Sequence, residues 1–387
     1  MNLIPMPRKV ALSGPPVPFR SAEHRIDSSL PAQGYVLLIE PSGLTLSGAD
    51  EAGLFYGEAT LAQLARVARS GDGTVPAGVI EDHPDLPVRA VMLDISRDKV
   101  PTVPTLEAVI DRLAALKVNM VQLYSEHTFA YRDHTEVHAA ASPLDEDDIG
   151  RLDAFCRARH VELVPNQNCL GHMNRWLAHE RYRPLALEPD GFVDPFGISR
   201  APMTIDPGNP ASLELVRSLL AELLPNFTSR RVHVGLDEPW ELPAARVDEF
   251  LAWVRTLRAL PELDGYEMLM WGDVVAGHPE HVAALPEGVT VCEWGYEHGA
   301  PFDEHCAVLE GAGVPFWVAP GTSSWTTIIG RITNARALEH GAVLIEGRPV
   351  LVAPLADGHA FGECGDAFGV PGHDVSPHEH VVAVELG

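Results

Sequence analysis

The stretch RRVHVGLDE, residues 230–238, joins a short apolar run to two adjacent acids, Asp237 and Glu238. Its first half predicts a buried β-strand, and the helical pattern ASLELVRSLLAELL (211–224) comes before it. A second helical pattern, PAARVDEFLAWVRTLRAL (243–260), follows it. The two acids therefore stand where a strand ends within an alternating strand–helix unit.

The same alternation of strand and helix patterns continues on both sides of this unit. Alternation over about 250 residues favours a (β/α)8 TIM barrel, an α/β fold. A doubly wound sheet is the alternative, but no G-x-G-x-x-G follows the first expected strand. The expected strands are residues 89–96, 119–126, 161–168, 230–238, 267–273, 290–297 and 315–320, and the longer expected helices are 105–117, 145–160, 211–224 and 243–260.

Polar and aromatic residues stand just after these expected strands. The carboxyl ends of the strands of a barrel share one face, and that face carries the chemistry. Side chains that are far apart in the sequence would therefore meet in one pocket. The residues in these positions are Asp94, Glu126, His127, Asn166, Asn168, Asp237, Glu238, Trp271, Asp273, Trp294 and Tyr296.

Residues 1–85 predict a small α+β domain ahead of the barrel. GYVLLIE (34–40) and GLTLSG (43–48) predict paired strands, and the pattern over 51–68 predicts a helix. GDGTVPAG (71–78) predicts a turn-rich linker.

The barrel takes residues 86–387, and its last segment, residues 340–387, departs from the pattern. No Trp follows Trp325, and no amphipathic helix is evident there. AVLIEGRPVLVA (342–353) predicts an eighth strand that its Gly and Pro interrupt. We interpret this tail as divergent and irregular. An unclosed barrel would expose apolar strand edges, which a homodimer would cover.

The charge balance limits the partners of the chain. Across 387 residues there are 54 acids and 28 bases, a formal net charge of −26, and the basic residues do not cluster. Nucleic acid and anionic membrane surfaces are therefore not expected as partners, whereas a neutral sugar is. We find neither a signal core nor a transmembrane run, and the five scattered cysteines suit free thiols in a reducing cytoplasm. The cysteines and histidines match no zinc pattern, so we expect no metal and no cofactor.

Two adjacent carboxylates near tryptophans have the chemistry that glycoside cleavage needs. One acid protonates the leaving oxygen, and nearby negative charge stabilises the oxocarbenium-like transition state. Adjacent residues lie too close to act as acid and nucleophile on one anomeric carbon, so the pair suits substrate-assisted cleavage by a 2-acetamido group. Repulsion would favour a protonated Glu238 beside an ionised Asp237. The alternative is a solvated pair at the start of the next helix, where acids are common.

Several motifs along the chain resemble glycoside hydrolase family 20, the β-N-acetylhexosaminidases. HVGLDE resembles the family motif H-x-G-G-D-E, with Leu236 in place of the second Gly. The other matching stretches are VIEDHPDLPVRAVMLDISR (79–97), VPNQNCLGHMNRW (164–176), MWGD (270–273), EWGY (293–296), and YVLLIE with GLFYGEATLAQL near the N-terminus.

The resemblance implies a retaining, exo-acting enzyme that removes terminal β-linked N-acetylglucosamine or N-acetylgalactosamine from a small-molecule or oligosaccharide substrate. It assigns Glu238 as the general acid/base and Asp237 as the carboxylate that orients the acetamido group. The substrate-binding residues that we expect are Arg89 for the sugar hydroxyls, Glu126, His127 and His172 in support of the acids, Trp271 and Trp294 for the acetamido pocket, and Asp273, Tyr296 and Trp325.

Two departures from the family pattern bear on activity. FWVAPGTSSW (316–325) has no Tyr where the family binds the acetamido oxygen, and Tyr296 is the candidate substitute. The tail also lacks the Trp that the family's eighth strand carries. The alternative function is therefore an inactive sugar-binding barrel with an impaired eighth strand. A related substrate-assisted hydrolase with adjacent Asp residues matches the D-E pair less well.

Overall fold

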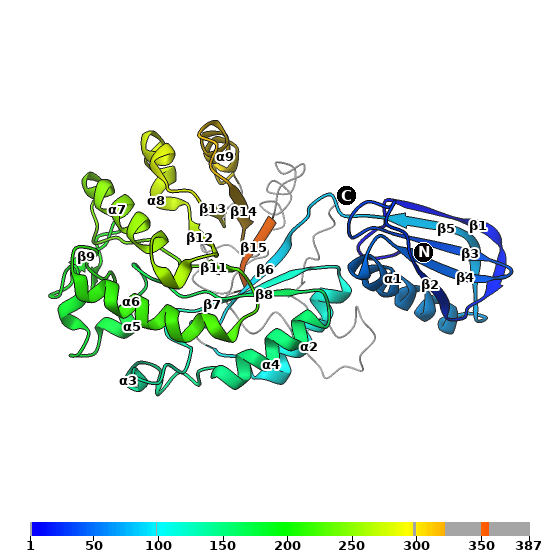
Figure 1. Ribbon diagram of the computed structural model, residues 1–387, viewed down its shortest axis with the longest axis horizontal. Helices are drawn as coiled ribbons and strands as arrows, with labels where there is room; N and C mark the ends of the chain where they lie inside the picture. The colour runs from blue at the N-terminus through cyan, green and yellow to red at the C-terminus, as the bar shows by residue number, and fades with distance from the viewer. Residues whose placement is uncertain (1, 98, 297–298, 322–349, 356–387) are drawn as a thin grey trace.

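The computed structural model describes residues 2–97, 99–296, 299–321 and 350–355. Two units follow one another along the chain, a small α+β domain and a (β/α)8 barrel, as the sequence predicts (Figure 1). Among the described residues, no helix has the length and apolar character needed to span a membrane.

The small domain is a five-stranded sheet with one long helix packed on it (Figure 1). Its strand order is β1-β5-β3-β4-β2, and the helix α1 (Glu51–Ser70) begins where the side chain of Asp50 accepts the Gly53 N–H at 2.7 Å. Apolar side chains alternate along the strands and meet the helix in a separate core. The strands are β1 (Lys9–Pro18), β2 (Ala22–Ile26), β3 (Tyr35–Glu40), β4 (Gly43–Gly48) and β5 (Thr74–Asp82).

The predicted linker GDGTVPAG (71–78) is wrong in its second half, because β5 begins at Thr74. The turn is confined to Gly71 through Gly73, and Gly73 has a φ of +82° that favours glycine. From Thr74 onward the chain pairs with β1, and from Gly78 to Asp82 it also pairs with β3. Pairing with β1 outweighs the local turn propensity of a stretch that contains Gly and Pro.

The barrel is a closed sheet of eight parallel strands in the order β11-β12-β13-β14-β15-β6-β7-β8. It closes between β8 and β11, where the His233 N–H donates to the Pro165 carbonyl at 2.9 Å and the Gln167 N–H donates to the His233 carbonyl at 3.0 Å. The strands are β6 (Arg89–Asp94), β7 (Met120–Tyr124), β8 (Glu162–Val164), β11 (Arg231–His233), β12 (Glu267–Trp271), β13 (Val289–Gly295), β14 (Phe316–Pro320) and β15 (Val350–Leu355).

The helices form a layer around the strands (Figure 1). They are α2 (Val103–Ala115), α3 (Thr135–His138), α4 (Glu146–Arg157), α5 (Asn174–Leu177), α6 (Pro210–Leu223), α7 (Val247–Arg258), α8 (Asp273–Ala276) and α9 (Phe302–Gly311). Short 3-10 turns lie at Arg183–Leu185, Leu224–Asn226, Ala244–Arg246, Pro261–Leu263 and Pro279–Ala284, and a hairpin of β9 (Phe192–Val193) and β10 (Ser199–Arg200) precedes α6.

Strand alternation separates the two sides of the barrel wall. Along β12, Met268 and Met270 face the helices, whereas Leu269 and Trp271 face the barrel interior. The same alternation puts Tyr124 of β7 inside. Side chains near the carboxyl ends of the strands therefore point toward a common centre.

The expected eighth strand is present as β15. Its backbone pairs with β14 at Val318 and with β6 at Arg89, so the strand edges on both sides are paired. The strand begins within the predicted stretch 342–353, at Val350. The rest of the tail and Trp325 lie outside the described residues. Because these edges are paired, they no longer argue for a homodimer, and the oligomeric state stays a prediction.

Candidate active site

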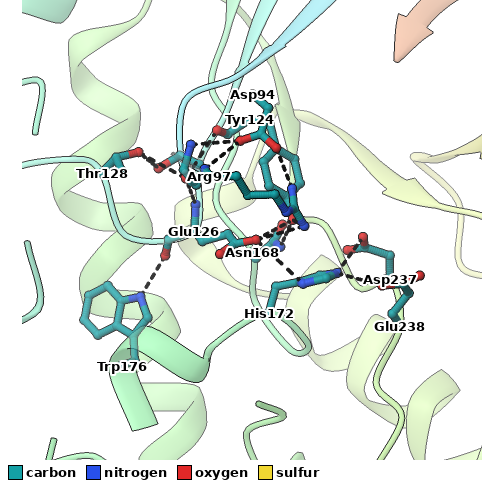
Figure 2. A network of polar contacts seen from close by, with 12 residues as sticks. Asp94, Arg97, Tyr124, Glu126, Thr128, Asn168, His172, Trp176, Asp237 and Glu238 are labelled. Atoms are coloured by element: carbon teal, nitrogen blue, oxygen red, sulfur yellow. Dashed lines mark hydrogen bonds and ion pairs between the residues drawn. The ribbon is translucent and has the colours of Figure 1, made fainter. Parts of the chain in front are cut away.

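The two adjacent acids and His172 meet at the carboxyl ends of the barrel strands (Figure 2). His172 lies in the loop after β8, and its Nε2 is 3.1 Å from Oδ2 of Asp237 and 3.4 Å from Oε2 of Glu238. Its Nδ1 is 3.6 Å from Oε1 of Glu126, which follows β7. One imidazole therefore bridges three carboxylates that the sequence predicted separately.

Arg97 occupies the side of the site that follows β6 (Figure 2). Its Nη1 is 2.6 Å from Oδ2 of Asp94, and its Nη2 is 3.1 Å from Oε1 of Glu126. Its guanidinium lies 4.8 Å from the centre of the Tyr124 ring. The Tyr124 hydroxyl donates to Glu126 at 3.1 Å and accepts from Asn168 at 2.7 Å. Arg97 and Tyr124 were missed in the sequence, although the Asp94-x-x-Arg97 spacing suits a loop that folds back on its strand.

Arg89 lies at the opposite end of the barrel, which corrects its expected role at the sugar hydroxyls. It is the first residue of β6, and a strand of this length separates it by about 17 Å from the strand's carboxyl end. Its guanidinium donates to the carbonyls of Lys117 and Leu86, at 2.7 and 2.8 Å, and to the Gln33 side chain of the small domain at 3.0 Å. Arg89 therefore joins the two units.

The backbone that carries the acids is strained. Leu236 has a φ of +76° and Glu238 a φ of +47°, and His172 has a φ of +57°. Side chains other than Gly rarely adopt this region, and each case costs on the order of 1 kcal/mol. Gly235 has a φ of +71°, and a Cβ there would lie 2.1 Å from Oδ1 of Asn168, so any larger residue would strain the backbone and displace that side chain. Strain that the surrounding structure maintains is typical of a functional site.

Asp273 holds the strained loop from a third strand end. Its Oδ2 accepts the Glu238 N–H at 2.9 Å. Burial, followed by the negative charge of Asp237, raises the pKa of Asp273 to about 7. The sequence did not predict this raised pKa at Asp273.

Asp237 and His172 form a largely buried ion pair, with 12% and 11% of their side chains exposed. Burial alone would raise the pKa of Asp237, but the charge and hydrogen bond of His172 hold this pKa below its ordinary value. Burial would likewise lower the pKa of His172, but Asp237, Glu238 and Glu126 together raise it well above its ordinary value. Asp237 is therefore ionised and His172 protonated near neutral pH.

A buried carboxylate fixes the far end of the acid loop. Glu241 accepts the Met203 N–H at 2.7 Å and the Thr204 N–H at 3.0 Å, and the Thr204 hydroxyl also donates to it. The Met203 carbonyl in turn accepts the Met173 N–H at 2.8 Å, next to His172. Glu241 thus connects the loop of the acids to the loop of the histidine, a role that the sequence did not predict.

The remaining predicted residues lie around this centre. Trp271 is buried, with its ring centre 4.5 Å from that of His233, and its indole N–H has no hydrogen-bond partner among the residues described. Trp294 and Tyr296 are half-buried and in edge contact, at 5.3 Å between ring centres. His127 is buried near Asp94 and Arg175, and burial lowers its pKa to about 4. In the part of the chain that the structure describes, no cluster of His, Cys, Asp and Glu suits a metal ion.

A closed (β/α)8 barrel with paired acids at the carboxyl ends of its strands defines the class, that of the barrel glycoside hydrolases. The family model for the glycosyl hydrolase family 20 catalytic domain matches residues 87–305, more than half of the chain, and the model for domain 2 of the same family matches residues 19–83. The chain belongs to glycosyl hydrolase family 20.

Known relatives agree with this assignment. The chain is 28% identical to the Lacto-N-biosidase of Bifidobacterium bifidum over 53% of its own length and 17% of the relative's. It is 27% identical to a Beta-N-acetylhexosaminidase of Cellulomonas fimi over 85% and 68%. The solved structure of Streptomyces plicatus N-acetyl-beta-hexosaminidase has a TM-score of 0.71 at 23% identity, covering 92% of this chain and 86% of that one, which shows the fold. The chain spans less than half the length of the first curated relatives that it matches.

Proposed function

We propose that this protein is a retaining, exo-acting β-N-acetylhexosaminidase that uses the 2-acetamido group of its substrate as the nucleophile. The observation that carries the proposal is the state of the two acids. Asp237 is buried and ionised, and its Oδ1 has no partner within the described residues. Glu238, whose side chain is 29% exposed, lies beside it on the open side.

In the first step, the acetamido oxygen attacks the anomeric carbon while the bond to the leaving oxygen breaks. Glu238 donates its proton to that leaving oxygen. Asp237 accepts the acetamido N–H through its free Oδ1 and stabilises the positive charge that develops on the nitrogen. His172 keeps Asp237 ionised, and Asp273 holds the backbone of Glu238 in place.

In the second step, Glu238 acts as the base. It removes a proton from water, the water oxygen attacks the anomeric carbon, and the cyclic intermediate opens to regenerate the acetamido group. Two displacements at one carbon give net retention of configuration.

Sugar binding follows from the groups around the acids. Arg97 takes the role that the sequence assigned to Arg89, because its guanidinium is partly exposed and faces the site. Trp271 and Trp294 supply apolar faces for the acetamido methyl group. The free cysteines among the described residues fit the proposed cytoplasmic location.

The experiment is turnover of 4-nitrophenyl N-acetyl-β-D-glucosaminide by the natural protein and by Glu238→Gln and Asp237→Asn. We expect each variant to lose at least about 100-fold in kcat. The 4-nitrophenyl β-D-glucoside should not be cleaved, since it lacks the acetamido nucleophile. Asp248→Asn, at a side chain that is 89% exposed, is the matched control.

An inactive sugar-binding barrel is the second candidate. Its support was an impaired eighth strand without the family's Trp, and the pairing of β15 with β14 and β6 weakens the first part of that support. A folded natural protein that binds N-acetylglucosamine and cleaves none of the glycoside would favour this candidate over the enzyme.

A further inference from the structure

The hairpin of β9 and β10 carries exposed apolar side chains on a rigid frame. Phe196 is 75% exposed and Ile198 52% exposed at its tip. Below them, the side chain of Asp194 is fully buried and accepts the N–H groups of Phe196 and Ile198 at 2.9 and 2.8 Å. It also accepts from Arg200 Nε at 2.8 Å. The buried carboxylate therefore fixes the shape of the tip while the apolar side chains stay in water.

This hairpin contacts the loop that carries the catalytic acids. The ring centres of Phe196 and Trp240 are 6.0 Å apart at an angle of 81°, an edge-to-face contact. The Arg200 guanidinium lies 5.9 Å from the centre of the Trp240 ring. The Trp240 N–H donates to the Glu238 carbonyl at 2.8 Å, and the Cα atoms of these two residues lie no more than about 7.6 Å apart. Figure 1 shows the hairpin at the end of the molecule away from the small domain.

A single exposed apolar residue needs no explanation, but this arrangement combines three features. Asp194 fixes the backbone at Phe196, the Phe196 ring is open to solvent beside the half-buried Trp240, and Trp240 follows the acid that protonates the leaving group by two residues. Ordering an exposed Phe side chain costs conformational entropy, and burial of its apolar surface offsets this cost only when another group covers the ring.

We infer that Phe196 and Trp240 form an aromatic platform that receives the leaving-group sugar of the substrate, the ring on the far side of the cleaved bond. A pyranose ring offers a flat face of C–H groups that packs on an aromatic ring and a rim of hydroxyls. The Arg200 side chain, which is 44% exposed, is placed to donate to that rim. This platform rests on the proposed function, since it concerns the same cleaved bond.

The platform makes the enzyme selective for what stands beyond the cleaved bond. A glycoside whose leaving group is a sugar or another flat ring would bind through its terminal N-acetylhexosamine and through its leaving group. A glycoside with a methyl leaving group would bind through the terminal N-acetylhexosamine alone. The test is calorimetric titration of the Glu238→Gln variant with methyl N-acetyl-β-D-glucosaminide and with N,N′-diacetylchitobiose.

We expect the disaccharide to bind about tenfold more tightly than the methyl glycoside. Adding Trp240→Ala should bring this ratio close to one, and Trp240→Phe should restore part of it. Val193→Ala is the matched control, since Val193 is exposed on the same hairpin and pairs with Ser199, and it should leave the ratio unchanged.

Equal affinities for the two ligands in Glu238→Gln would overturn the platform and leave the proposed function intact. Failure of both ligands to bind would overturn the two together. If Phe196→Ser abolished a dimer in analytical ultracentrifugation and left the ratio of affinities unchanged, the hairpin would be a contact between copies of the chain, and the platform would be wrong.

Discussion

Replacement of Asp273 by Asn tests the electrostatic description of the site. Asp273 begins α8, and its Oδ2 holds the Glu238 N–H. Burial and the neighbouring charge of Asp237 raise its pKa from 3.8 to about 7. Asn has nearly the same shape, keeps an oxygen for the Glu238 N–H and does not titrate. The substitution therefore removes the cost of ionisation alone.

The direction in which the free energy of unfolding changes with pH follows from the number of protons that the folded and unfolded chains bind. Below about pH 4 the carboxyl is protonated in both the folded and the unfolded chain, so its titration has no effect on stability. Between about pH 4 and pH 7 the unfolded chain has lost the proton that the folded chain keeps, and the free energy of unfolding falls as pH rises. Above pH 7 both states are ionised, and the destabilisation stays constant.

The magnitude follows from about 1.4 kcal/mol for each unit of pKa difference. The ionisation of Asp273 destabilises the folded state by about 1.5 kcal/mol at pH 5 and about 4 kcal/mol at pH 8. Solvent reaches part of this residue and reduces the difference. We expect Asp273→Asn to gain about 2 kcal/mol relative to the natural protein when the pH rises from 5 to 8.

The assay is urea unfolding of both proteins at pH 5 and pH 8, followed by tryptophan fluorescence. Asp248→Asn, at an exposed side chain, serves as the control and should unfold like the natural protein at both pH values. If the natural protein and Asp273→Asn differed by the same free energy at pH 5 and pH 8, Asp273 would have no raised pKa, and the reasoning would be refuted.

Three further predictions concern the groups around the acids. Glu241→Gln leaves one of three buried donors without an acceptor. We therefore expect the free energy of unfolding in urea to fall by about 1–3 kcal/mol and kcat to fall as well. Equal stability of the two proteins would contradict the anchoring role. Arg97→Lys replaces a planar guanidinium, which reaches Asp94 and Glu126 with separate nitrogens, by one ammonium nitrogen on a shorter side chain. KM for the nitrophenyl glycoside should rise about tenfold, whereas Arg89→Lys should change only stability. The reverse pattern would return sugar binding to Arg89. His172→Asn removes the charge that lowers the pKa of Asp237, so the acidic limb of the kcat/KM profile should move to higher pH, and an unmoved limb would count against the ion pair.

The barrel could be predicted because its strands are buried runs between amphipathic helices. The expected strand 267–273 corresponds to β12 (Glu267–Trp271), and the expected strand 161–168 is shorter, since β8 ends at Val164. Beyond that point the backbone around Asn166 bridges to His233 of β11, while the Asn166 side chain accepts the Ser125 N–H at 2.9 Å. Polar residues at a strand end thus connect neighbouring strands and shape the site.

The small domain was harder to predict for a physical reason. β1 has the sequence KVALSGPPVP, is largely exposed, and pairs with a single neighbour, β5. Gly and Pro at such an edge are compatible with a strand but locally favour turns. Only the tertiary pairing distinguishes the two, and a single sequence does not contain it.

For the site, the sequence predicted the residues whose chemistry is evident, Asp237, Glu238, His172 and Glu126, and these lie together. It missed Arg97, because an arginine three residues beyond a strand looks like an exposed loop residue. It placed Arg89 in the site, because Arg89 belongs to the matching stretch 79–97. Arg89 begins β6, however, and the catalytic face of a barrel lies at the carboxyl ends of the strands. Residues whose role depends on their position in the fold are the hardest to identify from the sequence.

The order of the strands also indicates where a divergent tail would affect catalysis. β15 pairs with β6, and the loop after β6 carries Asp94 and Arg97. The acids follow β11, whose neighbours are β8 and β12, on the other side of the barrel. Any displacement of β15 would therefore reach Arg97 through one ladder of hydrogen bonds before it reached Asp237 or Glu238. An altered C-terminal segment should weaken substrate binding first and proton transfer last, so a change in KM with kcat nearly constant would be its signature.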